Sequence, residues 1–348
     1  MSFKLTVFIE CVLLLLFATC AQSAAPPYNA ITMHTLKKHV VFLSDEALQG
    51  RLTGTPGEKR ALQYVATVFK QLGLEPLGDH DTYFQCFALT KRVLSNKKNA
   101  LHSQQHHLQS GCNVLAKLQL NEKNAAVLII GAHIDHLGHG ELTGSRAKNH
   151  EKKLIHPGAD DNASGVASLL ALAAQLSALK AQGQLHGNKD IIFAIWSGEE
   201  LGLLGSSYYA KQLNKPSWSM IDAYINLDMV GRLKKHLVLQ GVGSSPEWQP
   251  LIRRVSAKHH LSIRMQQDPY LPTDATTFYL RDRPVLNFFT GAHDDYHTPR
   301  DTVDRLNIVG LQRITTWLLD FVLTLTKEQR LGYKLVAKML FIIGRCSF

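Results

Sequence analysis

The sequence predicts an α/β fold, a three-layer α/β/α sandwich around a mixed, mostly parallel central sheet. From about residue 113 onward, short apolar runs of β character alternate with segments of helical period, which is typical of parallel strands joined by helices. The chain has 348 residues, 45% of them apolar, enough for one sizeable core. Since no linker rich in Pro, Gly or Ser divides it, we expect a single domain over residues 24–330.

Six apolar runs are predicted to be buried strands because each is short and of β character. They are residues 113–120, 126–131, 191–196, 223–227, 237–240 and 285–289.

The clearest helix is predicted to begin after Thr55, which serves as its cap, with Pro56 in the first turn and Glu58 three residues after the cap. Its apolar face continues to Leu72, and Gly73 ends it. Further helices are expected at about 164–180, 246–259 and 307–326.

The two ends of the chain differ from the domain between them. Residues 1–23 resemble a signal peptide, with Lys4 before an apolar stretch and small residues that allow cleavage before Ala24. We therefore expect export, to the periplasm or by secretion. A lipoprotein cleavage site at Cys20 is the less favoured reading. The basic and apolar tail, residues 331–348, is expected to pack on the domain rather than contact a membrane.

Charge and cysteine content exclude several classes. The formal charge is +10, but only 19% of residues are charged and the bases are scattered, so no nucleic-acid partner is expected. Outside the signal, Cys86, Cys112 and Cys346 have no C-x-x-C spacing, which excludes a thiolate zinc site. A disulfide between Cys86 and Cys112 and buried free thiols both remain open. The polar segment 91–111, with a patch of three histidines (His102, His106 and His107), is expected to be an exposed loop rather than a metal site.

Acidic and histidine residues follow the predicted strands, at the sheet edge where ligands bind in open α/β folds. His133 comes after the run 126–131, and Asp135 is close enough to accept its second ring N–H. Asp161 lies in a tight turn before a helix. Glu199 and Glu200 follow the run 191–196, and adjacent side chains diverge by about 100° at the start of a helix, so one can bind metal while the other faces water.

Two more candidates complete the set. Asp228 follows the run 223–227, and an acid there needs a cation or strong donors; His297 lies in a loop near the end of the domain, where His293, Asp294 and Asp295 are expected to be supporting residues. Two imidazoles and three carboxylates suit two Zn²⁺ ions, one carboxylate bridging them and one His and one carboxylate completing each site. Such a pair can share a hydroxide and polarise a carbonyl.

The motifs GAHIDH, PGADDNASG, SGEELGLLG, NLDMVG and YHTPRDT occur in this order. With Gly50-Arg51 near the start, they resemble the zinc aminopeptidases of metallopeptidase family twenty-eight, of the leucyl aminopeptidase or aminopeptidase Y type, over residues 39–307. The resemblance implies a zinc-exopeptidase, phosphorylase/hydrolase-like fold. It also implies His133 and Asp228 on one zinc, Glu200 and His297 on the other, and Asp161 as the bridge.

The same resemblance implies a mechanism. Glu199 is the general base for a metal-bridged water that attacks the scissile carbonyl, and Tyr296 stabilises the oxyanion. The substrates are peptides with a free N-terminus, the Asp161-Asn162 peptide is cis, and we expect a monomer. Ala275 stands where relatives often have a His, which puts the pocket wall there in doubt. The residues before the first zinc motif are too few for the protease-associated domain of many relatives.

Three alternatives stay open. A glutaminyl cyclase keeps much of this residue set with one zinc. A non-catalytic binding ectodomain would retain the fold without hydrolysis. Carboxypeptidase or dipeptidase action is compatible with the same metal residues.

Overall fold

The structure is a computed structural model that describes residues 30–89, 110–121, 126–140 and 144–337. The predicted signal peptide, the patch of His102, His106 and His107, and the tail from residue 338 lie outside the described residues. The predicted boundaries of the domain, 24 and 330, remain a prediction.

Nine strands of the described chain form one mixed sheet, in the order β1-β3-β5-β4-β6-β9-β7-β8, with β2 also paired to β3. The central strands β5, β4, β6 and β9 are parallel, whereas β3 and β7 run antiparallel to their neighbours β5 and β9. The strands are β1 (Glu75–Pro76), β2 (Phe84–Ala88), β3 (Ser110–Leu118), β4 (Ala126–His133), β5 (Lys189–Trp196), β6 (Ile221–Leu227), β7 (Leu237–Gln240), β8 (Ile263–Met265) and β9 (Val285–Phe289).

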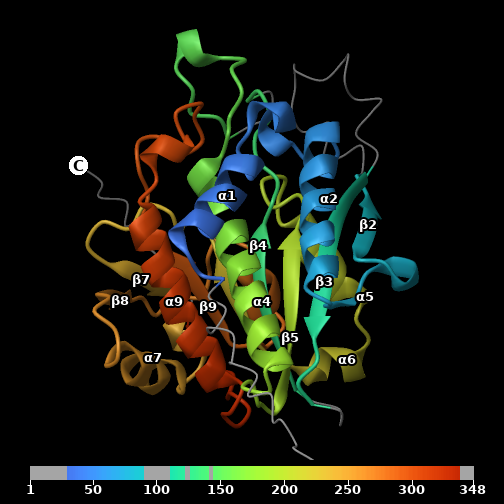
Figure 1. Cartoon of the computed structure of the whole chain (residues 1–348), viewed down its shortest axis with the longest axis vertical. Helices are drawn as coiled ribbons and strands as arrows, with labels where there is room; N and C mark the ends of the chain where they lie inside the picture. Colours follow the sequence, from blue (N-terminus) through green and yellow to red (C-terminus); the bar gives the residue numbers. More distant parts are fainter. Residues whose placement is uncertain (1–29, 90–109, 122–125, 141–143, 338–348) are drawn as a thin grey trace, which may run out of the picture.

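Helices cover both faces of the sheet, which confirms the three-layer prediction. In Figure 1, α4 lies in front of the sheet with α2 on one side and α9 on the other. The opposite face is covered by α5, α6 and α8, which pack on β3, β6 and β9. The helices are α1 (Met33–Leu43), α2 (Pro56–Gln71), α4 (Gly165–Ala181), α5 (Leu204–Gln212), α6 (Lys215–Met220), α7 (Trp248–Ser256), α8 (Ala275–Tyr279) and α9 (Ile308–Leu325).

The predicted strands and helices are all present, with shifts of a few residues at their ends. Thr55 caps α2 by accepting from the Glu58 N–H, as its position predicts. The sequence interpretation did not include α1, α6 and α8 or the strands β1, β2 and β8. It expected Glu199 and Glu200 at the start of a helix, whereas they lie in a turn and α5 begins only at Leu204. It also placed Ser110 and Gly111 in a loop, whereas they begin β3.

The register of the parallel strands brings their carboxyl ends together. His133 at the end of β4 pairs with Trp196 at the end of β5, and Gly131 pairs with Asn226 of β6. All eight residues of β5 are buried, because both faces of the central sheet are covered by helices. Side chains that follow these strands therefore lie at one edge.

A disulfide joins Cys86 of β2 to Cys112 of β3. The two residues are directly opposite each other in the antiparallel ladder. The sequence left a disulfide and buried free thiols open, and the structure has the disulfide.

The first residues of the predicted tail pack on the domain. Lys189 at the start of β5 and Asp222 of β6 form a buried ion pair with an N–O distance of 2.6 Å, and the other oxygen of Asp222 accepts from the Leu331 N–H. The Val336 N–H donates to the Tyr279 hydroxyl.

Two helical segments, Ala159–Ala181 and Ile308–Leu325, are long and apolar enough to cross a membrane, and in the fold the larger part of the first is buried.

Candidate metal centre

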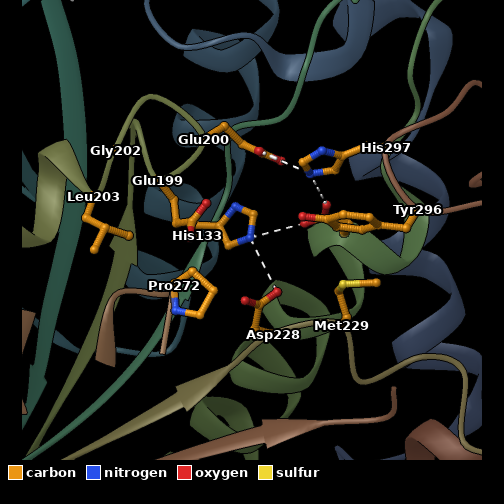
Figure 2. A pocket seen from close by; sticks show the side chains of 11 residues that line it. His133, Glu199, Glu200, Gly202, Leu203, Asp228, Met229, Pro272, Tyr296 and His297 are labelled. Atoms are coloured by element: carbon orange, nitrogen blue, oxygen red, sulfur yellow. Dashed lines mark ion pairs between the residues drawn. The ribbon is translucent and has the colours of Figure 1, made fainter. Parts of the chain in front are cut away.

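The candidate ligands lie at the carboxyl edge of the central strands. His133 ends β4, Glu199 and Glu200 follow β5, and Asp228 follows β6. The loop before α4 supplies Asp161, and the loop after β9 supplies His297. These side chains line one pocket (Figure 2).

One group of donors surrounds His133. Its Nε2 lies 3.2 Å from Asp161 Oδ1 and 3.5 Å from Asp228 Oδ1. All three side chains are buried or nearly so. The predicted ligands His133, Asp161 and Asp228 therefore lie close together.

A second group surrounds His297. Its Nε2 lies 3.1 Å from Asp161 Oδ2 and 3.2 Å from Glu200 Oε2. Asp161 therefore directs one oxygen to each group, the arrangement that a bridging carboxylate requires. The five predicted ligands are all brought together.

The two histidines are oriented by hydrogen bonds to backbone carbonyls. The Nδ1–H of His133 donates to the Asp135 carbonyl oxygen over 3.2 Å, and that of His297 donates to the Gly144 carbonyl oxygen over 2.9 Å. Each bond fixes the tautomer and leaves the Nε2 lone pair directed at the carboxylates.

The donor set fits divalent cations. Donor atoms of His133, Asp161 and Asp228 lie within 4.8 Å of one another, as do those of His136, Asp161 and Glu200. Although His297 Nε2 is close, Asp161 Oδ2 has no hydrogen-bond partner among the described residues. Imidazole nitrogens and carboxylate oxygens without thiolates are ligands that zinc accepts.

The electrostatics of the cluster point the same way. Burial acts to lower the pKa of His297, but the adjacent carboxylates of Asp161 and Glu200 outweigh it and raise the pKa to about 10. Burial likewise acts to lower the pKa of His133, yet Glu199, Asp161 and Asp228 raise it well above its usual value. A surplus of nearby negative charge raises the pKa of an imidazole in this way. A bound cation would balance the same surplus.

Asp135 differs from its prediction in the atom that it uses. Its carboxylate oxygen lies 3.9 Å from His133 Nδ1, and the backbone oxygen is the acceptor instead. The carboxylate accepts from the backbone N–H groups of Glu199 and Glu200 and from the Thr53 hydroxyl. It orients the two glutamates rather than the imidazole, because those N–H groups lie nearer.

Glu199 lines the pocket beside His133 (Figure 2). Burial raises the pKa of its carboxyl well above the usual value, and the neighbouring Glu200, Asp274 and Asp228 add to this, while His133 opposes it. A raised pKa makes a carboxylate a stronger base.

The pocket has a volume of about 370 Å³. Its apolar wall consists of Leu203, Met229 and Pro272. Tyr296 reaches into it between His297 and Met229 (Figure 2), and its ring stacks on the His297 ring with centroids 3.7 Å apart. Ala275 is fully buried in the core and does not line the pocket, whereas Pro272 does.

The loop that carries Asp161 is held by its neighbours. The Asp301 carboxylate accepts from the backbone N–H groups of Asp160 and Asp161. The Asn162 side chain donates to the Leu227 carbonyl and accepts from the Gly165 N–H. The Asp161-Asn162 peptide is cis, as the family resemblance implied.

The sequence analysis did not identify two residues that support the site. Arg51 is buried and donates to the carbonyl oxygens of Ile134, Leu43, Pro157 and Gly158, which ties the loop after β4 to the turn before Asp161. His136 is fully buried, and its Nδ1 lies 3.0 Å from Glu200 Oε1. Both occur in motifs that the sequence displays, but no periodicity marks them.

The loop residues near His297 have supporting contacts. His293 Nε2 lies 3.1 Å from Asp160 Oδ2, and Asp295 pairs with Arg232 and Arg300. The Asp294 carbonyl accepts from Arg300.

Comparison with known proteins gives a family match. The model of peptidase family M28 matches residues 113–322. A probable leucine aminopeptidase 2 of Aspergillus fumigatus is 30% identical over 192 residues, which cover 52% of this chain and 33% of that protein. Leupeptin-inactivating enzyme 1 of Streptomyces exfoliatus is 28% identical over 219 residues, 62% of this chain and 40% of that protein. The chain thus matches less than half the length of these relatives.

Solved structures share the fold. BSAP, a zinc aminopeptidase from Bacillus subtilis, superposes with a TM-score of 0.67 at 17% identity and covers 87% of this chain and 97% of its own. A Zn-dependent exopeptidase from Parabacteroides distasonis gives 0.64 at 19% identity, covering 86% and 99%.

Proposed function

The chain belongs to peptidase family M28, and we propose that it is a zinc-dependent aminopeptidase that removes N-terminal residues from peptides. The observation that carries this proposal is the position of Asp161, whose two oxygens face His133 and His297 at 3.2 Å and 3.1 Å. Two ions are proposed, the first held by His133 and Asp228, the second by Glu200 and His297, with Asp161 shared.

Bound zinc supplies Lewis-acid polarisation of the scissile carbonyl and acidifies water. The residues of the chain move the protons. Glu199 accepts the proton of the attacking water and delivers it to the leaving amine, which its raised pKa favours. The Asp135 carboxylate holds Glu199 by accepting from the Glu199 backbone N–H. Tyr296, which lines the same pocket, would donate to the developing oxyanion.

The pocket wall supports an apolar N-terminal residue as substrate. Leu203, Met229 and Pro272 offer no charged partner for a side chain, and an apolar pocket favours apolar groups through burial. The free amine of the substrate would lie near the carboxylates of Glu199 and Asp228.

Export is proposed as well. A disulfide such as Cys86–Cys112 persists in oxidising compartments, which agrees with the predicted signal peptide. Amino-terminal sequencing of the exported protein is expected to begin at Ala24, and recovery of uncleaved chain from the cytosol alone would contradict it.

The decisive experiment combines zinc analysis with initial rates on aminoacyl amides that carry free or acetylated N-termini. We expect hydrolysis of the free amides, fastest with apolar residues. Equal rates on both would contradict an aminopeptidase and favour another exopeptidase. Conversion of an N-terminal Gln peptide to the pyroglutamyl peptide, with loss of ammonia and one zinc per chain, would favour a glutaminyl cyclase. Zinc binding without hydrolysis would favour a binding ectodomain.

A further inference from the structure

The two carboxylate oxygens of Glu200 have different partners. Oε2 lies 3.2 Å from His297 Nε2, on the side where Asp161 also lies. Oε1 accepts a hydrogen bond of 3.0 Å from the Nδ1–H of His136. Glu200 is therefore oriented by a histidine outside the predicted ligand set.

The His136 ring is fixed in place. It is fully buried, and its backbone N–H donates to the Arg51 carbonyl over 3.2 Å. The turn at Gly158 packs against the ring so closely that a Cβ at that residue would lie 2.6 Å from His136 Cδ2. With its backbone tied to Arg51 and its ring packed against Gly158, His136 directs Nδ1 to Glu200 Oε1.

The contact of His136 differs from those of the predicted ligand histidines. It has the geometry of a hydrogen bond, whereas Asp161 Oδ2, 3.1 Å from His297 Nε2, has no hydrogen-bond partner within the described chain. His136 Nδ1 is also farther from that oxygen, at 3.7 Å. This geometry favours His136 as a hydrogen-bond donor to Glu200 rather than as a metal ligand.

We propose that His136 is a positioning residue of the metal centre: it holds Glu200 Oε1 so that Oε2 is directed at the cation that Asp161 and His297 also face. The inference rests on the proposed metal centre, but not on the proposed reaction. Because hydrogen bonds that orient a ligand contribute about 10–100-fold to metal affinity, His136 makes the second site bind zinc more tightly.

Two variants of the full chain test the proposal through zinc affinity, measured by competition with a chromophoric chelator. His136→Leu removes the donor and is expected to weaken one of the two zinc sites about 10–100-fold, with the other unchanged. In His136→Asn, the amide nitrogen takes the place of Nδ1 and still donates to Glu200, so both affinities are expected to stay near those of the parent. His156→Leu is the matched control, because this neighbouring buried histidine contacts Ser145 and Leu154 instead of a ligand.

Three results would overturn it: His136→Leu binding both ions like the parent, His136→Asn losing as much affinity as His136→Leu, or a parent chain that binds no zinc. If His136→Leu does not fold, the Co²⁺-loaded parent decides by proton NMR. Two contact-shifted imidazole N–H signals are expected, from His133 and His297, and a third would make His136 a ligand. Failure to hydrolyse peptides, with these zinc results intact, would reject the proposed reaction alone.

Discussion

The backbone N–H of Glu199 donates to Oδ1 of Asp135 over a distance of 3.1 Å. This bond links the turn after β5 to the loop after β4, the strand that ends at His133. The proposed general base and the first ligand histidine are thereby held at a fixed separation, as a shared catalytic unit requires.

Glu199→Gln is expected to lose nearly all turnover, by roughly 10²–10⁴-fold, because an amide cannot accept the proton. Zinc content should stay at two per chain, since Glu199 is not among the proposed ligands. The variant is checked by steady-state kinetics together with metal analysis. Near-normal hydrolysis would remove Glu199 from the base role.

Asp161→Ala is expected to reduce zinc content at both sites, because its two oxygens face both donor groups. Asp228→Ala should weaken one site only, since Asp228 contacts the His133 group alone. Metal analysis after dialysis against dilute chelator measures the difference. Equal zinc loss in the two variants would argue against a bridging role for Asp161.

Arg51→Met is expected to lower the free energy of unfolding by roughly 3 kcal/mol, because several buried carbonyl groups lose their donor. Urea denaturation of the metal-free chain gives this value without a contribution from zinc. Arg253→Met, at an exposed position on α7, is the control. The prediction fails if the two variants are equally stable.

The disulfide is expected to stabilise the fold. Cys86 and Cys112 are 26 residues apart, and closing a loop of that length contributes about 3.5 kcal/mol in the chain-entropy model. The double variant Cys86→Ala, Cys112→Ala should unfold at lower urea concentration than the oxidised parent and match the reduced parent. A parent whose stability is insensitive to reductant would contradict this.

Glu58 is expected to make stability depend on pH. Burial, aided by Asp135, raises the pKa of its carboxyl from 4.5 to about 8 in the folded chain. Between these values the folded state binds a proton that the unfolded state releases, so stability falls as pH rises from about 4.5 to about 8.

Glu58→Gln cannot ionise and should lack that decline. Compared with the parent, the variant is expected to gain relative stability as pH rises through this window, measured as urea midpoints of the metal-free chains. Parallel pH curves for the two proteins would refute the assignment.

The sequence predicts the central sheet well because β4, β5, β6 and β9 are continuous apolar runs, the form that strands covered on both faces take. Among the five ligand candidates, His133, Glu200 and Asp228 stand out because they follow such runs. Asp161 and His297 lie in loops, and the family motifs point to them. The strands β1 and β8 have two and three residues, too few for any period to appear.

Other features depend on contacts between distant segments. Arg51 donates to the carbonyl of Pro157, 106 residues later, and His136 contacts Glu200, 64 residues later. Pairing of Cys86 with Cys112 requires the register of β2 on β3. No local pattern encodes such contacts, so they emerge only in three dimensions.

The buried pair of Lys189 and Asp222 lies at the amino ends of β5 and β6, whereas Glu199 and Asp228 follow the carboxyl ends of the same strands. A strand of eight residues spans roughly 26 Å, and mutational effects at such separations usually add. The amino end of the sheet is therefore a place where heat tolerance can be engineered while turnover is left as it is.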